Sequence, residues 1–257
     1  MKQLLTLTGC VALAMDSYDE ASSNFTEAYG EDATYDRAIQ IYEAYLEKDM
    51  EADGTRYLEA ALKTEAKNAE DYCNRGKVYY YMEDYSNAQK ELTEAVNQKS
   101  TEGMLLLGMV YRAQGDTSNA RSMYQQYVSA DGSDPAKGYN GLALCDMDDG
   151  SYDSALENIS KGLEDASTEE MQDLLFNEIV VYEKKLDFAT ALSKMQEYIK
   201  MFPDDENAAK ELTFLQSRNG ELSNDTASDT TENTDAEAAS DAGDAADTSD
   251  EAGEEEY

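Results

Sequence analysis

The chain has 257 residues, of which 56 are acidic and 20 basic, and it has no histidine, so its net charge is −36. A field of this sign repels phosphate backbones and anionic lipid surfaces, which argues against nucleic-acid binding. The lack of histidine excludes Ser-His and Cys-His nucleophilic systems and histidine zinc sites.

An alanine returns through the chain with a period of about thirty-four residues. It stands at Ala21, Ala88, Ala120, Ala155 and Ala191, and Gly54 takes its place once. A large apolar residue follows each of these positions, and a tyrosine usually precedes it. A fixed period of this length predicts stacked helix pairs, in six units. The units span residues 2–33, 34–67, 69–100, 101–132, 136–169 and 172–203.

Residues 1–15 admit three interpretations. Lys2 and the apolar run after it resemble a short secretory signal, and residues 7–10 resemble the lipobox of lipoproteins, in which Cys10 would be acylated. We favour the third, the first helix of the first unit, because the run before Cys10 is short and residues 11–14 stay apolar. The chain is then cytoplasmic as written, while an exported or lipid-anchored protein of the bacterial cell surface is the alternative. Since leucines stand at the start without a polar cap, we hypothesise that further repeats preceded Met1.

Each unit is predicted to be two helices separated by a tight turn. In the third unit, apolar and small residues recur at three- and four-residue steps on both sides of Glu83-Asp84. Later turns hold Gly115-Asp116 and Gly150-Ser151, where glycine permits a left-handed end and Asp or Ser caps the next helix. Small residues let helices approach closely, so we expect three glycines of first helices to meet alanines of second helices. These are Gly9, Gly76 and Gly108 against Ala21, Ala88 and Ala120.

These recurring positions, here called columns, resemble those of the tetratricopeptide repeat family, including its bacterial members. The third unit matches at Gly76, Tyr79, Ala88, Leu92 and Ala95, and the sixth at Tyr182, Ala191, Met195 and Pro203. The second unit departs from the family pattern, since Tyr42 and Gly54 stand in its small-residue columns. The fifth unit has Asp146 in the tyrosine column, which indicates a shifted helix or a local insertion. The resemblance implies an all-α, right-handed α-solenoid of about six helix pairs, with a C-terminal capping helix at residues 204–218.

Residues 219–257 differ in composition from the repeat region, with 14 acidic and no basic side chains. Such a segment buries too little apolar surface to offset its ordering entropy, so we expect a disordered acidic tail. A solubilising role is the simpler interpretation, and a partner-binding role is the alternative.

No constellation of catalytic residues, phosphate-binding glycine loop or cofactor motif appears, so the chain is predicted not to be an enzyme. The acidic stretch 146–150 resembles a calcium loop, but Cys145 stands in its first position. We interpret it as an inter-helix turn and expect no metal, cofactor or membrane-spanning segment. Cys10, Cys73 and Cys145 lack metal-ligand spacing and are predicted to be buried thiols.

In the family, a concave groove is lined by first-helix side chains, and this implies a protein or peptide partner. Carried over by column, the groove residues are Lys77, Tyr80, Tyr81, Met109, Arg112, Lys137, Asn140 and Lys184, with Cys73, Leu105, Leu144, Phe176, Val180 and Glu183 beside them. Aromatic anchors beside Arg112 would suit a peptide that bears an acidic group. The function expected is that of a non-catalytic scaffold or adaptor. The alternatives are a surface protein that binds peptides, glycans or a transporter, and an accessory subunit of an enzyme.

Overall fold

The structure is a computed structural model that describes residues 2–231, with side chains for residues 4–205 and 207–220. Within this range all regular structure is helical. The helices are α1 (Lys2–Ala14), α2 (Tyr18–Glu31), α3 (Tyr35–Leu46), α4 (Glu51–Ala61), α5 (Ala69–Tyr81), α6 (Tyr85–Asn97), α7 (Thr101–Ala113), α8 (Thr117–Val128), α9 (Pro135–Asp148), α10 (Tyr152–Leu163), α11 (Thr168–Lys184), α12 (Phe188–Met201) and α13 (Glu206–Thr231). The predicted α-solenoid of six helix pairs and a following helix is confirmed.

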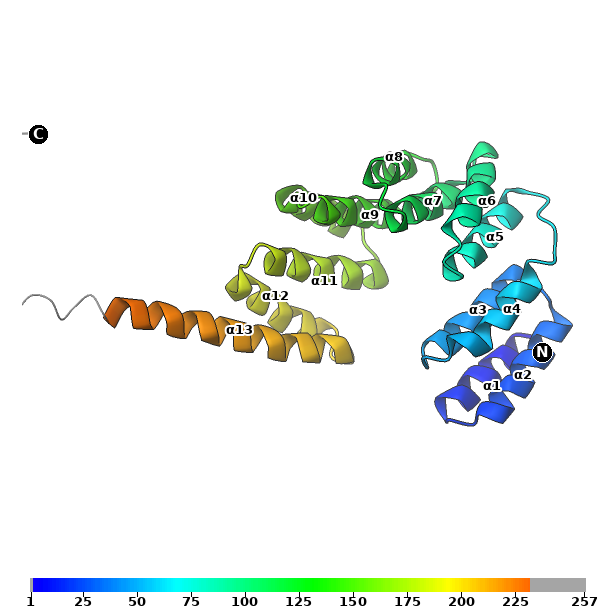
Figure 1. Ribbon diagram of the computed structural model, residues 1–257, viewed down its shortest axis with the longest axis horizontal. Coiled ribbons are helices and arrows are strands. Elements are labelled where there is room, and N and C mark those ends of the chain that lie inside the picture. Colours follow the sequence, from blue (N-terminus) through cyan, green and yellow to red (C-terminus); the bar gives the residue numbers. More distant parts are fainter. Residues whose placement is uncertain (1, 232–257) are drawn as a thin grey trace, which may run out of the picture.

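The pairs stack into an arch, with α1–α4 at one end and α11–α13 at the other (Figure 1). Each odd-numbered helix from α1 to α9 contacts the next odd-numbered one, and each also packs against the second helix of its own pair. In Figure 1, α7 and α9 follow the inner side of the arch and α8 lies outside them. First helices therefore form the inner wall, which is the arrangement that positions the candidate site.

The glycines of the first helices make room for large side chains of the second helices. A Cβ atom added to Gly76 would lie 2.4 Å from Leu92 Cγ, and one added to Gly9 would lie 2.5 Å from Phe25 Cε1. The space beside each of these glycines is thus filled by the large apolar side chain of the second helix. The column alanines are fully buried, and their small size lets the packed helices approach closely.

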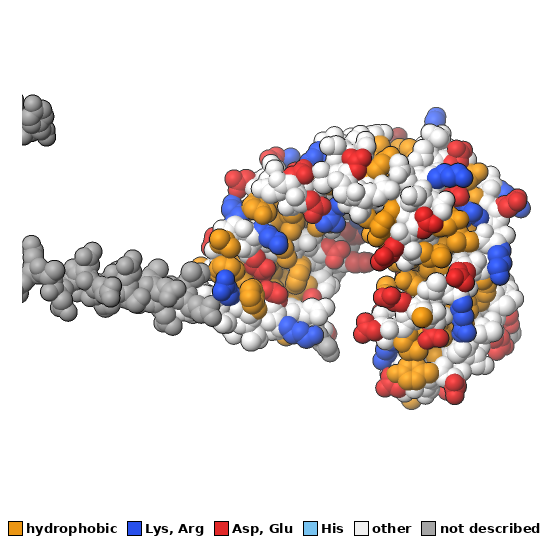
Figure 2. All heavy atoms as spheres, viewed as in Figure 1, with side chains coloured by type: hydrophobic (Ala, Val, Ile, Leu, Met, Phe, Trp, Pro, Cys, Tyr) orange, Lys and Arg blue, Asp and Glu red, His pale blue; other side chains and the backbone are white. Residues whose placement is uncertain are grey.

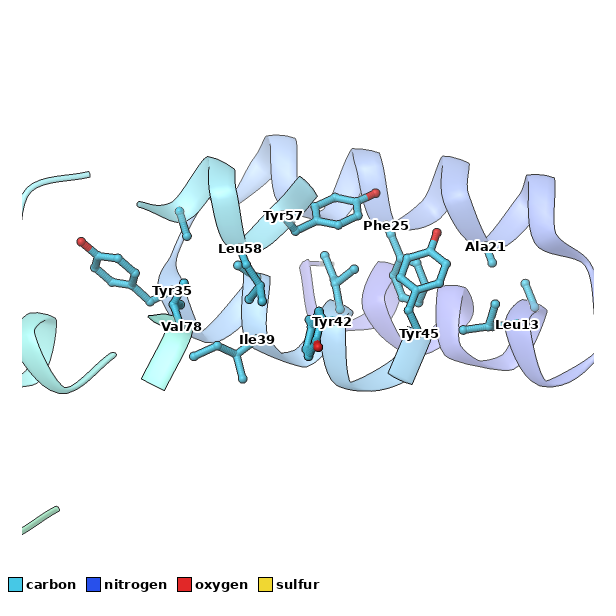
Figure 3. Packing of buried hydrophobic residues seen from close by; sticks show 14 residues of the cluster. Leu13, Ala21, Phe25, Tyr35, Ile39, Tyr42, Tyr45, Tyr57, Leu58 and Val78 are labelled. Carbon is cyan, nitrogen blue, oxygen red and sulfur yellow. The ribbon is translucent and has the colours of Figure 1, made fainter. Parts of the chain in front are cut away.

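The second unit exchanges its small and large positions. Gly54 stands where other units have alanine, and a Cβ there would lie 2.9 Å from Tyr42 Cδ2. The bulk of Tyr42 on α3 is therefore matched by the missing side chain on α4. The neighbouring core is aromatic: the rings of Phe25 and Tyr45 lie 5.2 Å apart, and Tyr45 stacks with Tyr57 at 6.5 Å. Figure 3 shows these rings between the four helices of the first two units.

The turns follow the prediction at most positions. Glu83, Gly115 and Gly150 are all left-handed, with φ of 56°, 78° and 72°. Asp84 and Asp116 each accept a hydrogen bond from a backbone N–H three residues later, at 3.1 Å. Ser151 makes no such side-chain bond, so the predicted serine cap is wrong and α10 begins without one.

The fifth unit is neither shifted nor interrupted, which corrects the interpretation of Asp146. Helix α9 is continuous, and Asp146 occupies the tyrosine column as a buried carboxylate. It accepts hydrogen bonds from Arg121 Nη1 at 2.6 Å and from Asn158 Nδ2 at 2.7 Å. Two polar partners on α8 and α10 thus satisfy the charge that replaces the aromatic ring.

At the amino end, residues 2–14 form α1, as the helix interpretation predicted. Ala12 and Leu13 belong to a buried cluster with Ala21 and Phe25 of α2. The other face of α1 exposes Leu4 and Leu7, each of which is 60% exposed.

At the carboxyl end, α13 continues to Thr231, so the boundary predicted at residue 218 falls inside this helix. Residues 232–257, which hold most of the predicted acidic tail, lie outside the described residues.

Two of the cysteines are buried thiols, as predicted. Cys73 and Cys145 are buried and Cys10 is half-buried, and all three are free. Burial raises the pKa of the Cys145 thiol to about 11, so this thiol stays protonated at neutral pH.

Candidate partner-binding groove

Four successive helix pairs together line one hollow of about 760 Å³, here called the central hollow. Its lining comes from α5, α7, α8, α9 and α11 and from the turns after α7 and α9. The residues are Tyr80, Leu105, Met109, Arg112, Ala113, Gly115, Thr117, Tyr124, Lys137, Asn140, Gly141, Leu144, Asp148, Asp149 and Asp173. Because they come mostly from first helices, the hollow opens on the inner wall of the arch.

The floor of the central hollow is apolar and aromatic. Leu105, Met109 and Leu144 supply aliphatic surface, and Tyr80 and Tyr124 supply ring surface. Burial raises the pKa of the Tyr80 and Tyr124 hydroxyl groups above that of free tyrosine. Both phenols therefore stay neutral and act as amphipathic walls, a type of surface suited to an inserted side chain.

Two ion pairs fix one rim of the hollow. Arg112 donates two hydrogen bonds to Asp148, from Nε at 2.6 Å and from Nη2 at 3.2 Å. Burial lowers the pKa of Arg112, but the bonds to Asp148 outweigh this effect and raise it above its ordinary value. Asp149 accepts bonds from Arg121 Nη2 at 2.8 Å and Thr117 Oγ1 at 3.0 Å. The guanidinium of Arg112 is therefore already paired with a carboxylate of the chain itself.

The opposite rim carries one engaged cation and one carboxylate without a partner. Lys137 Nζ lies 3.4 Å from Glu170 Oε1 and 3.9 Å from Asp134 Oδ2. Asp173 has no hydrogen bond or ion pair among the described residues. Burial and then the nearby charges of Glu169 and Glu170 raise its pKa. Asp173 therefore presents an uncompensated charge to the hollow.

A second hollow of about 410 Å³, the C-terminal hollow, adjoins the first and shares Asn140, Leu144 and Asp173 with it. It is further lined by Gln172, Phe176, Asn177, Tyr198, Asp205 and Asn207. Asn177 Nδ2 donates to Asn140 Oδ1 at 2.7 Å, and Tyr198 donates its hydroxyl proton to Asp205 at 2.7 Å. The two hollows form one continuous groove from α5 to the start of α13.

Among the predicted groove residues, Tyr80, Met109, Arg112, Lys137 and Asn140 come together in the central hollow. Leu105 and Leu144 join them there, and Phe176 lies in the C-terminal hollow.

The other predicted groove residues lie elsewhere. Lys77 Nζ lies 3.5 Å from Glu43 Oε1, and the Tyr81 hydroxyl donates to the same carboxylate, so both face α3. Cys73 is buried, with Sγ 3.0 Å from Ser100 Oγ, which corrects its placement in the groove. Val180, Glu183 and Lys184 line neither hollow.

The sequence interpretation missed the acidic half of the site. The sequence predicts only a turn at Asp148 and Asp149, and the groove columns do not include Asp173. Asp173 precedes Phe176 by three residues, so the two share a helix face, and this spacing was a signal that could have found it. The pairing of Asp148 with Arg112 joins residues far apart in sequence and left no local signal.

Among the described residues, metal-binding clusters and membrane-spanning helices are both absent. No three His, Cys, Asp or Glu side chains among them gather closely enough to hold a metal ion. None of the helices within residues 2–231 combines the length and hydrophobicity needed to cross a membrane.

A family model for the tetratricopeptide repeat matches residues 73–135 and 105–167, the stretch that supplies most of the central hollow. Over residues 73–167 the chain matches the tetratricopeptide repeat family. The match covers nearly all of the third, fourth and fifth predicted units.

Solved tetratricopeptide and related structures share this fold at low identity. A tetratricopeptide repeat protein from Parabacteroides merdae ATCC 43184 is 18% identical, with 84% of each chain covered and a TM-score of 0.64. PilW, a type IV pilus biogenesis factor, is 15% identical over 82% of this chain and 98% of its own, at 0.55. The Cut9-Hcn1 hetero-tetramer of APC/C gives 16% identity over 82% of this chain and a TM-score of 0.52, but the match spans 42% of that chain. No curated protein sequence matches the chain.

Proposed function

We propose that this protein is a non-catalytic adaptor that binds a segment of a partner protein in the groove formed by the two hollows. The observation that carries the proposal is the central hollow itself, in which first helices of successive pairs bring Tyr80, Met109 and Arg112 together with Lys137 and Asn140. Its apolar floor can take one side chain, while the rims are polar. Pockets of this composition gain affinity from a buried anchor and orientation from a few polar groups.

The groove also suits the backbone of an extended segment. Amide side chains both donate and accept hydrogen bonds, as a peptide group does. Asn140 and Asn177 stand at the junction of the hollows, and Gln172 and Asn207 stand in the C-terminal one. A segment anchored in the central hollow could therefore continue along α11 with its peptide groups paired.

The test is a selection of random peptides against the full chain, followed by titration of the selected peptides. Leu144 lines both hollows, so Leu144→Arg fills the junction and should weaken binding by about tenfold or more. Leu186→Arg is the matched control, because Leu186 is 71% exposed in the turn between α11 and α12 and lines neither hollow. A circular dichroism spectrum unchanged in both variants excludes unfolding. A selection that yields no peptide, or peptides that bind both variants equally, would overturn the proposal.

A further inference from the structure

The side chains that line the groove indicate which residue types the partner segment carries. We infer that the groove takes an apolar side chain flanked by lysine or arginine, so that a positively charged segment of a partner protein is its occupant. This inference rests on the proposed function, because it names the occupant of the same groove. It reverses the charge expected from the sequence, in which Arg112 was to receive an acidic group.

The charges that line the two hollows do not balance. Four carboxylates line them, Asp148, Asp149, Asp173 and Asp205, against the two cations Arg112 and Lys137. Both cations are engaged by carboxylates of the chain itself. An incoming carboxylate would have to displace Asp148 or Glu170 from a formed ion pair, and an incoming cation displaces nothing.

Asp173 is the group that an incoming cation would meet. It lines both hollows, has no ion pair among the described residues and lies near Glu169 and Glu170. A lysine or arginine beside Leu144 would stand next to this carboxylate. Such a pair relieves the repulsion that Asp173 feels from its own helix, whereas a ligand carboxylate would add to it.

The field of the whole chain has the same sign. The net charge is −36, and Figure 2 shows red Asp and Glu side chains around the open space enclosed by the arch. A concave surface of one sign concentrates ligands of the opposite sign. The acidic residues 219–257 of this chain are therefore disfavoured as an occupant of its own groove.

The experiment compares three synthetic peptide pools with the full chain by fluorescence anisotropy. Each pool fixes one leucine at its centre, flanks it with arginine, glutamine or glutamate, and randomises the outer positions among uncharged residues. The arginine pool should bind about tenfold more tightly than the glutamate pool, with the glutamine pool between them. Added salt should weaken the arginine pool most, because screening acts on the charged contacts.

Two variants link this preference to named side chains. Asp173→Asn should weaken the arginine pool by about threefold and leave the glutamine pool unchanged. Asp148→Asn releases Arg112, so the glutamate pool should gain affinity. Asp131→Asn is the control, since this exposed carboxylate in the loop after α8 lines neither hollow.

The outcomes separate this inference from the function on which it rests. If the three pools bind equally, or the glutamate pool binds best, the groove binds segments without the inferred charge preference and the inference is wrong. An arginine preference that survives Asp173→Asn unchanged also contradicts it, because the preference then arises elsewhere. If no pool binds and the random selection also fails, the proposed function falls as well.

Discussion

At the scale of single residues, the array is held by side chains that fit into the spaces left by glycines. Tyr124 is the clearest case, because it lies between Gly108 of its own pair and Gly141 of the next. A Cβ on Gly108 would lie 2.7 Å from Tyr124 Cε1, and one on Gly141 would lie 2.6 Å from the same atom. The ring therefore packs against both first helices, and it also forms part of the floor of the central hollow.

Gly141→Ala should destabilise the protein, although alanine is the better helix former. The added methyl group meets three atoms of a ring that cannot move toward Gly108, which we expect to cost about 1–3 kcal/mol. Gly30→Ala is the control: apart from its own helix backbone and chain neighbours, no atom lies within 4 Å of its Cβ position, so it should gain up to about 1 kcal/mol. Urea unfolding of both variants measures the two signs, and a gain in both would contradict the packing argument.

Asp146 offers a second test at this scale. Asp146→Ala leaves Asn158 without its acceptor and Arg121 with only Asp149, so we expect a loss of about 2–3 kcal/mol. Asp149→Asn weakens an exposed pair of the same arginine and should cost less than about 1 kcal/mol. A double-mutant cycle of Asp146→Ala and Arg121→Ala should give a coupling energy of about 0.5–3 kcal/mol. Additive losses would show that the two side chains act independently.

At the scale of elements, the packing of α13 on the last helix pair includes an acidic contact. Glu183 of α11 is half-buried, its Oε1 atom has no hydrogen-bond partner among the described residues, and Glu211 of α13 lies nearby. Burial, and then the charge of Glu211, raises the pKa of Glu183 to about 7, while Lys184 opposes the shift. Ionisation of Glu183 therefore opposes the docking of α13.

The sign of the pH dependence follows from this shift. Because the folded pKa of Glu183 is raised from 4.5, the folded state holds its proton more tightly than the unfolded state does. The contribution of this group to stability is complete below pH 4.5 and is lost as the pH rises through about 7. Glu183→Gln should thus stabilise the protein relative to wild type by an amount that grows to about 1–2 kcal/mol at pH 8, after allowance for solvent screening.

Urea unfolding between pH 5 and pH 8 measures this difference between variant and wild type. Glu169→Gln is the control, because it removes an exposed carboxylate from the same helix. Its difference from wild type should change less over this range than that of Glu183→Gln. A Glu183→Gln difference that stays constant would contradict the assigned shift.

At the scale of the whole molecule, the periodic part of the structure could be predicted from the sequence and the polar contacts between units could not. The period predicts the six helix pairs because each unit buries the same recurring positions. Even the exchanged pair Tyr42 and Gly54 keeps one large residue packed against one small residue. Asp146 broke the column pattern, since its partners Arg121 and Asn158 belong to other helices. The charge of the groove could not be predicted from the sequence for the same reason: Arg112 pairs with Asp148, a residue of the next unit.

The curved inner wall and the groove in it arise only when all the pairs are stacked. The methyl signals of the methionines report on such a surface without any substitution, because the chain has 11 of them spread along its length. Met109 lines the central hollow, whereas Met15 and Met201 are 72% and 49% exposed and line neither hollow.

The most direct test of the central claim is therefore a titration of methyl-labelled protein with a selected arginine-flanked peptide, followed by nuclear magnetic resonance. Our account predicts that the Met109 signal shifts and saturates with the affinity measured by anisotropy, while the Met15 and Met201 signals stay in place. A peptide that moves Met15 or Met201 and leaves Met109 unchanged would contradict the account, because the binding surface would then lie outside the groove.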